Sequence, residues 1–170
     1  MKDAVPQEHK ARAPASVGCF VLTISDSKTP ETDTSGALIR ELVSAAGHRV
    51  TGHAIVKDEP AQVAAVIRSG CAAPSVEAFI LTGGTGITSR DSTYEAIDAL
   101  LDKRLAGFGE LFRMLSYQDI GAAAMLSRAQ GGVVQGRILF SLPGSPNACR
   151  LALERLIIPE LPHLIGEVRR

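Results

Sequence analysis

The stretch that decides the fold is VEAFILTGGTGITSRD, residues 76–91, in which an apolar run passes directly into a glycine-rich loop. The apolar part, residues 76–82, is short and nearly continuous, which is typical of a strand buried on both faces. Residues 91–101 then show helical spacing. A buried strand, a loop and a helix in this order predict a β-α-β unit and hence a mostly parallel sheet covered by helices.

The same alternation of strands and helices extends outward along the chain in both directions. We predict strands at 17–24, 49–56, 132–134 and 137–142, and helices at 37–46, 60–72, 107–117 and 147–158. Pro159 and Pro162 are expected to break the chain before a last short helix. The prediction is an α/β fold in a single domain at residues 17–170, preceded by a flexible N-terminal arm at residues 1–16.

The composition excludes several classes of protein. The 170 residues carry 18 Lys and Arg against 18 Asp and Glu, so the basic excess of a general nucleic-acid binder is absent. No apolar run approaches the roughly 18–20 residues that span a bilayer, and the first residues lack the apolar core of a secretion signal. Three widely spaced cysteines without a CxxC motif indicate reduced thiols. We therefore expect a cytoplasmic protein that binds neither nucleic acid nor membrane.

The glycine-rich loop is a candidate phosphate cradle. Gly83, Gly84 and Gly86 leave room for an anion to approach backbone N–H groups, and Thr85 adds a hydroxyl donor. The loop lacks the lysine of a Walker A motif, and Ser89 stands where a dinucleotide-binding fingerprint needs glycine. The alternative is an ordinary turn between a strand and a helix.

A second loop joins a strand to a helix at residues 141–147, SLPGSPN. Ser145 fits the helix N-cap and Pro146 the first helical position. The exposed N–H groups of such a turn favour a phosphate or a carboxylate. Simple helix capping is the alternative.

Acidic residues follow or precede these loops. Asp58 comes after the strand at 49–56 and Asp91 ends the glycine-rich loop, so both could be helix-start carboxylates. At one edge of a parallel sheet they could instead hold Mg²⁺, which takes one or two protein carboxylates and keeps several waters. Ser25, Asp26 and Ser27 follow the first strand and lie at the same predicted edge.

No arrangement for nucleophilic catalysis stands out. The four histidines lie outside these loops, the cysteines lie in or beside apolar segments, and no Gly-x-Ser-x-Gly elbow occurs. A phosphate monoester needs no base to attack another phosphate; it needs alignment and charge neutralisation. Two anion cradles and two carboxylates match that chemistry.

Six short motifs follow one another within residues 17–168. They are Thr23-Ile24-Ser25-Asp26-Ser27, Thr82-Gly83-Gly84-Thr85-Gly86, Arg90-Asp91, Gly107-Phe108-Gly109-Glu110, Met125-Leu126-Ser127-Arg128 and Leu142-Pro143-Gly144-Ser145-Pro146. In order and spacing they resemble the MoaB/Mog family of molybdenum cofactor biosynthesis proteins, and the stretch at residues 151–164 is closer to the MoaB branch. The resemblance implies a three-layer α/β molybdopterin-binding fold assembled as trimers or hexamers.

The resemblance also implies an activity: Mg²⁺-dependent transfer of AMP from ATP to the terminal phosphate of molybdopterin, with release of pyrophosphate. It makes Asp58 and Asp91 the catalytic and metal-binding residues. It places the nucleotide phosphates at Gly83, Gly84, Thr85, Gly86, Leu142, Pro143, Gly144 and Ser145, and the pterin near Ser25, Asp26, Ser27, Glu110, Ser127 and Arg128. A non-catalytic molybdopterin-binding or scaffold protein of the same pathway is the alternative.

Overall fold

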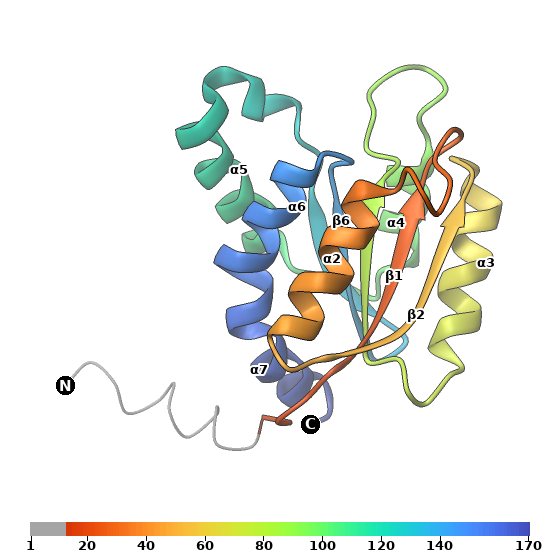
Figure 1. Ribbon diagram of the computed structural model, residues 1–170, viewed down its shortest axis with the longest axis vertical. Helices are drawn as coiled ribbons and strands as arrows, with labels where there is room; N and C mark the ends of the chain where they lie inside the picture. The colour runs from red at the N-terminus through yellow and green to blue at the C-terminus, as the bar shows by residue number, and fades with distance from the viewer. Residues whose placement is uncertain (1–12) are drawn as a thin grey trace.

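The computed structural model describes residues 13–170, so most of the predicted N-terminal arm lies outside the described residues. The described chain forms a six-stranded sheet with helices on both faces (Figure 1). The strands are β1 (Gly18–Ile24), β2 (Arg49–Val56), β3 (Ala78–Gly83), β4 (Lys103–Arg104), β5 (Gln130–Val134) and β6 (Arg137–Leu142). The helices are α2 (Thr34–Ala45), α3 (Pro60–Cys71), α4 (Thr93–Leu100), α5 (Ala106–Ile120), α6 (Pro146–Ala152) and α7 (Ile158–Val168), with a 3-10 helix η1 (Gly121–Leu126) and a π-helical turn η2 (Leu153–Ile157).

The sheet has the order β2-β1-β3-β6-β5-β4 and is mostly parallel, as predicted. β1 pairs in parallel with β2 and β3, and β3 pairs in parallel with β6. β5 and β4 add an antiparallel edge. The two-residue strand β4 was not predicted, since two exposed basic residues give no strand pattern.

The helices form one layer on each face of the sheet. Alternate residues of β1 show this: Val21 packs on the side of α2, α5, α6 and α7, whereas Leu22 packs on the side of α3 and α4. In β3 the same alternation places Ile80 and Leu81 on opposite faces. Both faces of the central strands are therefore covered, which explains their nearly continuous apolar sequences.

The hairpin between β5 and β6 turns at Gln135 and Gly136. Both residues have positive φ, 46° and 72°. This is the conformation of a type I′ turn, whose twist matches that of paired strands. Asp102 supports the turn by accepting a hydrogen bond of 2.6 Å from the Gln135 amide.

The expected break at Pro159 and Pro162 is wrong. The helical path continues from α6 through η2 into α7, with Pro159 in the first turn of α7 and Pro162 inside that helix. The wider π-helical turn η2 ends just before Pro159. It therefore lies where Pro159, which has no backbone N–H, cannot donate the usual helical hydrogen bond. Leu161 and Ile165 are buried against the sheet, and this burial stabilises the helix across Pro162.

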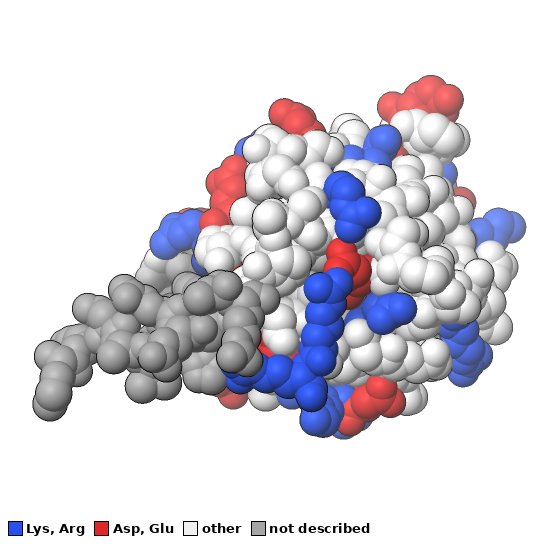
Figure 2. Space-filling view, turned by 90° about the horizontal axis from the view of Figure 1, so that it is seen from below, with Lys and Arg blue, Asp and Glu red and all other residues white. Residues whose placement is uncertain are grey.

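At the opposite end of the sheet from the strands' carboxyl ends, Glu77 bonds to residues at the start of β1, at the start of β2 and after α7. It is 9% exposed and accepts a 2.6 Å hydrogen bond from the Gly18 amide. Arg49 and Arg169 both pair with it, so the carboxylate is neutralised although it is nearly buried. Figure 2 views the molecule from below and shows basic side chains beside acidic ones on this surface.

The cysteines behave as predicted from their apolar surroundings. Cys19, Cys71 and Cys149 are buried and free. Burial raises the pKa of the Cys19 thiol to about 12 and also raises the pKa of Cys71 and Cys149. None is therefore poised as a thiolate nucleophile. Within residues 13–170, no helix is long and apolar enough to cross a membrane.

Candidate functional site

The loops after β1, β3 and β6 meet at the carboxyl ends of the parallel strands, at the top of Figure 1. Gly83 has a φ of +94°, and a Cβ built on it would lie 2.1 Å from the carbonyl oxygen of Ile24. A Cβ on Gly144 would lie 3.6 Å from the Cα of Gly83. The two glycine-bearing loops, whose Gly83 and Gly144 are 61 residues apart in the sequence, thus lie so close that a side chain on Gly144 would touch Gly83.

Asp58 faces the glycine-rich loop. A Cβ built on Gly84 would lie 3.4 Å from Asp58 Oδ1, and that oxygen is buried without a hydrogen-bond partner. The Asp58 amide donates a 3.1 Å hydrogen bond to Asp26 Oδ1. Asp58 does not cap α3, because Glu59 occupies the N-cap position and makes no side-chain capping bond. The prediction that Asp58 caps α3 is therefore wrong. The unpaired Oδ1 of Asp58 faces the glycine-rich loop.

Asp91 closes the glycine-rich loop on itself. Its Oδ2 accepts a 2.7 Å hydrogen bond from the Thr88 amide, and a Cβ on Gly86 would collide with the Asp91 carboxylate at 2.3 Å. Hydrogen bonds from the side chain and amide of Thr88 hold the pKa of Asp91 below its ordinary value. The carboxylate is therefore ionised at neutral pH. The next helix, α4, begins at Thr93, and the Ser92 side chain does not cap it.

Arg128 reaches the same loop from the segment between η1 and β5. Its Nε donates a 3.2 Å hydrogen bond to the carbonyl oxygen of Thr85, and a terminal nitrogen donates to the carbonyl of Gly86. The guanidinium also pairs with Glu95 and stacks 4.4 Å above the centre of the Tyr94 ring. In the structure Arg128 therefore holds the backbone of the loop.

The loop of residues 143–145 is fixed from below by buried hydroxyls. Thr82 Oγ1 donates to the carbonyl of Pro143 at 3.1 Å, and Ser35 Oγ donates to the carbonyl of Gly144 at 2.8 Å. Ser145 caps α6 as predicted, accepting a 3.2 Å bond from the Ala148 amide, and Pro146 occupies the first helical position. Sequence reasoning missed Ser35, because its partner is 109 residues away and no local pattern connects them.

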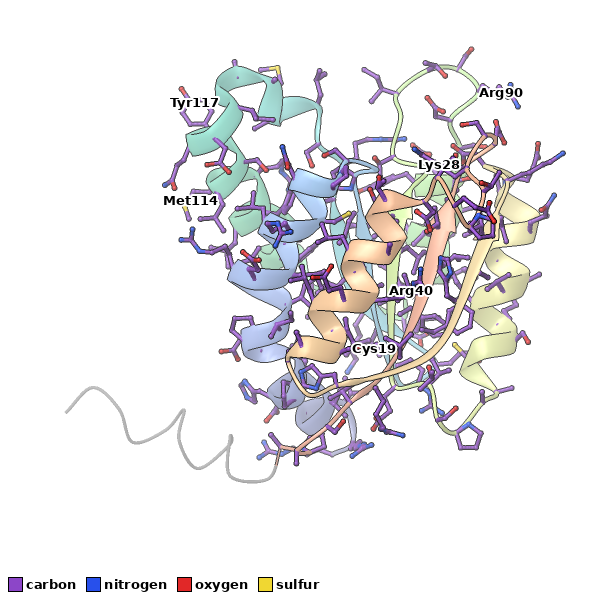
Figure 3. The ribbon with its side chains drawn as sticks, in the orientation of Figure 1. Cys19, Lys28, Arg40, Arg90, Met114 and Tyr117 are labelled. Atoms are coloured by element: carbon purple, nitrogen blue, oxygen red, sulfur yellow. The ribbon has the colours of Figure 1, made fainter. Side chains whose placement is uncertain are left out.

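The residues after β1 line the same end of the molecule. Ser25 Oγ accepts 3.2 Å hydrogen bonds from the amides of Ser27 and Lys28. Arg90 pairs with Asp26 at 3.4 Å. Figure 3 shows Lys28 and Arg90 at the end where the loops gather. This edge therefore has both carboxylates and cations within the loops that surround it.

The remaining predicted contacts lie beside this cluster. Glu110 is on α5 and lines a cavity of about 220 Å³ together with Tyr94 and Arg113. The Tyr94 ring beneath Arg128 connects that cavity to the glycine-rich loop. Ser127 Oγ accepts a 3.4 Å hydrogen bond from the Ala129 amide. Glu110 itself forms no hydrogen bond with either loop, so the structure does not bring it into the central cluster.

The sequence of the chain matches a known protein family. A model of the family described as "Probable molybdopterin binding domain" matches residues 20–163. The molybdenum cofactor biosynthesis protein B of Bacillus cereus is 52% identical over 164 residues, which cover 96% of this chain and 97% of that protein. The Bacillus subtilis protein of the same name is 50% identical over 165 residues, covering 96% of this chain and 97% of its own length.

Solved structures agree with the sequence matches. A crystal structure of a molybdenum cofactor biosynthesis protein B superposes with a TM-score of 0.90 at 52% identity, covering 93% of this chain and 99% of that one. The tungsten cofactor synthesizing protein MoaB of Pyrococcus furiosus gives a TM-score of 0.81 at 39% identity, covering 93% of this chain and 100% of that one. The chain therefore belongs to the molybdopterin-binding domain family, in the MoaB branch of the molybdenum cofactor biosynthesis proteins.

Proposed function

We propose that this protein transfers the adenylyl group of ATP to the terminal phosphate of molybdopterin, giving adenylyl-molybdopterin and pyrophosphate. One observation carries the proposal: the buried, unpartnered Asp58 Oδ1 lies against a loop of glycines at the point where three parallel strands end. A buried carboxylate oxygen without a partner is costly, so it points to a ligand that completes it. Phosphate-bound Mg²⁺ has the required charge and oxygen preference.

The reaction needs no general base from the protein. An oxygen of the molybdopterin phosphate forms a bond to the α-phosphorus of ATP, while the bond from that phosphorus to the β-phosphate bridging oxygen breaks. The attacking oxygen is ionised near neutral pH, and pyrophosphate leaves with the electron pair. The protein then has to align two phosphates that repel each other and neutralise their charge.

We assign those tasks to the two loops and their neighbours. Gly83, Gly84, Thr85 and Gly86 present backbone N–H groups to the nucleotide phosphates, and Leu142, Pro143, Gly144 and Ser145 form the opposite wall. Ser25, Asp26 and Ser27 line the mouth, and Glu110, Ser127 and Arg128 lie on the pterin side. Arg90 supplies positive charge at the loop. The close approach of Gly144 to Gly83 supports this assignment, because it sets the two loops side by side.

The donor set fits Mg²⁺ held largely by water and phosphate. Among residues 13–170, no three His, Cys, Asp or Glu side chains are grouped to hold a metal ion alone. Asp58 and Asp91 are the two carboxylates set against the glycine-rich loop, and Mg²⁺ in phosphate sites takes one or two such ligands. When bound there, the ion would neutralise charge on the phosphates.

The test is to incubate the folded protein with ATP, Mg²⁺ and molybdopterin and to measure pyrophosphate. We expect pyrophosphate release that requires all three components. Release without molybdopterin would indicate plain ATP hydrolysis instead. Molybdopterin binding measured by calorimetry, with no ATP binding and no pyrophosphate, would contradict the proposal and favour the non-catalytic alternative.

We also propose that the chain assembles as a trimer or hexamer through α5 and η1. Apolar side chains on these elements are unusually exposed: Leu111 47%, Met114 53%, Tyr117 64%, Ile120 60%, Met125 78% and Leu126 58%. Met114 and Tyr117 point outward from α5 in Figure 3. A surface of this kind is typical of an interface between subunits.

Tyr117→Glu is expected to shift the assembly toward monomers, because it places a charge within the apolar surface. Sedimentation should give three or six times 17.9 kDa for the wild-type chain and a lower mass for the variant. Ala45→Glu, which adds the same charge at the exposed end of α2, is the control and should sediment as the wild type does. A monomeric wild-type chain would contradict the proposal.

Arg128→Lys is expected to raise the KM for ATP about tenfold with little loss of stability, since a lysine cannot donate to two carbonyls from one planar group. The glycine-rich loop would lose a support that reaches Thr85 and Gly86. Arg68→Lys on the exposed side of α3 is the matched control. An unchanged KM in Arg128→Lys would show that the loop holds its shape without the guanidinium.

A further inference from the structure

Two consecutive carbonyl groups in the loop of residues 143–145 are turned toward the protein interior. The Pro143 carbonyl accepts from Thr82 Oγ1, and the Gly144 carbonyl accepts from Ser35 Oγ. Both donors are nearly buried, with Thr82 1% and Ser35 6% exposed. Cys149 Sγ lies 3.5 Å from the Pro143 carbonyl oxygen and 3.2 Å from Thr82 Oγ1, so it also packs below the loop.

Holding a carbonyl inward fixes the direction of the next N–H group. In a trans peptide the C=O of one residue and the N–H of the next point in opposite directions, and no cis peptide occurs in residues 13–170. The amides of Gly144 and Ser145 are therefore directed away from Thr82 and Ser35. Within the described chain neither amide donates to a protein acceptor.

A buried carboxylate fixes the turn of α2 that carries Ser35. Asp33 is 2% exposed and caps α2 by accepting a 2.9 Å bond from the Gly36 amide. Its other oxygen accepts from Thr23 Oγ1 at 2.7 Å and lies 3.0 Å from His53 Nε2. These three partners fix the first turn of α2, and Ser35 lies between the cap and Gly36.

We propose that Ser35 and Thr82 are positioning residues for phosphate binding: by holding the Pro143 and Gly144 carbonyls inward, they present the Gly144 and Ser145 amides to a bound phosphate. The ligand class rests on the proposed function, since the phosphate belongs to ATP there. Neither hydroxyl touches the ligand. Each prevents the opposite peptide orientation, in which a carbonyl oxygen would face and repel the anion.

The variants separate this role from simple packing. Thr82→Val removes the hydroxyl and keeps the shape of the side chain, whereas Thr82→Ser keeps the hydroxyl and loses a methyl group. Ser35→Ala removes the second hydroxyl, and Ser44→Ala makes the same change at an exposed position of the same helix. If Thr82 only packs, Thr82→Ser should be the more harmful of the two changes, because it loses a methyl group. If Thr82 positions the loop, Thr82→Val should be the more harmful, because it loses the hydroxyl.

Two measurements test the proposal on the full chain. The first is the KM for ATP and kcat in the pyrophosphate assay. We expect Thr82→Val and Ser35→Ala each to raise KM about tenfold, the effect of one well-placed hydrogen bond to a charged group, with Thr82→Ser and Ser44→Ala near wild type. The second follows the amide NMR signals of Gly144 and Ser145 during titration with inorganic pyrophosphate. These signals should shift in the wild type and in Thr82→Ser, and much less in Thr82→Val.

The two measurements distinguish failure of the positioning role from failure of the proposed function. If no turnover occurs but both amide signals shift in a way that depends on the Thr82 hydroxyl, adenylyl transfer is wrong and the positioning role stands. If turnover occurs and Thr82→Val keeps the wild-type KM and the wild-type shifts, the positioning role is wrong. Wild-type amides that do not respond to pyrophosphate would also overturn it.

Discussion

Asp91→Asn is expected to lower adenylyl transfer by about 10²- to 10³-fold, the usual cost of losing one preorganised charge or donor at a reacting phosphate or carbonyl. The asparagine keeps an oxygen that can accept the hydrogen bond from the Thr88 amide, so the loop should retain its shape. The negative charge is lost. Steady-state rates of pyrophosphate release measure the effect, and the melting temperature should remain near that of the wild type.

The matched control is Asp102→Asn. Asp102 also accepts a hydrogen bond from a loop amide, that of Gln135, but it lies at the β5–β6 turn. Asparagine can keep that bond as well, so each variant loses one charge and keeps an acceptor for the loop amide. Asp102→Asn should leave turnover unchanged. Equal rates in the two variants would remove Asp91 from the mechanism.

The protonation of Asp91 should not limit the reaction at ordinary pH. Its hydrogen bonds with Thr88, and the nearby charges of Arg128 and Arg90, keep its pKa below the ordinary value of 3.8. The carboxylate is therefore charged throughout the range in which the protein is assayed. A loss of activity on acidification near neutral pH would have to come from another group, such as the phosphate of the substrate.

The strand-loop-helix order could be read from the sequence because each central strand is an apolar run that ends at a polar or glycine-rich turn. The run before Gly83 and the run before Pro143 are buried on both faces, and burial of that kind leaves a clear pattern. β4 could not be found in this way, since its pairing depends on β5 and on no pattern of its own. The continuation of α7 through Pro162 could not be predicted either, because burial of the helix overrides the tendency of proline to end a helix.

The central part of the candidate site was more predictable than its supports. Parallel strands end at one edge, so Asp58, Gly84 and Gly144 were expected together, and the structure brings them together. The hydroxyl of Ser35 and the guanidinium of Arg128 act through backbone carbonyls that are distant in sequence. Any residue can present a carbonyl, so such contacts leave no signature in the types of residue along the chain.

Gly83→Ala is expected to destabilise the fold by about 4 kcal/mol or more, a loss large enough to unfold a domain of ordinary stability. Two costs add at this position. Alanine disfavours a φ of +94°, and its Cβ would lie 2.1 Å from the carbonyl oxygen of Ile24, a backbone atom in the middle of the sheet that cannot move aside. Relief would require separation of β1 from β3 at the point where both strands enter the site.

Gly47→Ala separates the two costs. Gly47 has a similar φ of +83°, but no atom lies within 4 Å of a Cβ built there. That variant should therefore lose only the conformational term, about 1–2 kcal/mol. Urea unfolding followed by circular dichroism measures both free energies, and failure of Gly83→Ala to fold at all would be the extreme of the expected result. If the two variants lose the same free energy of unfolding, the close approach of Gly83 to Ile24 adds no cost of its own, which would contradict a tight junction between β1 and β3 at this point.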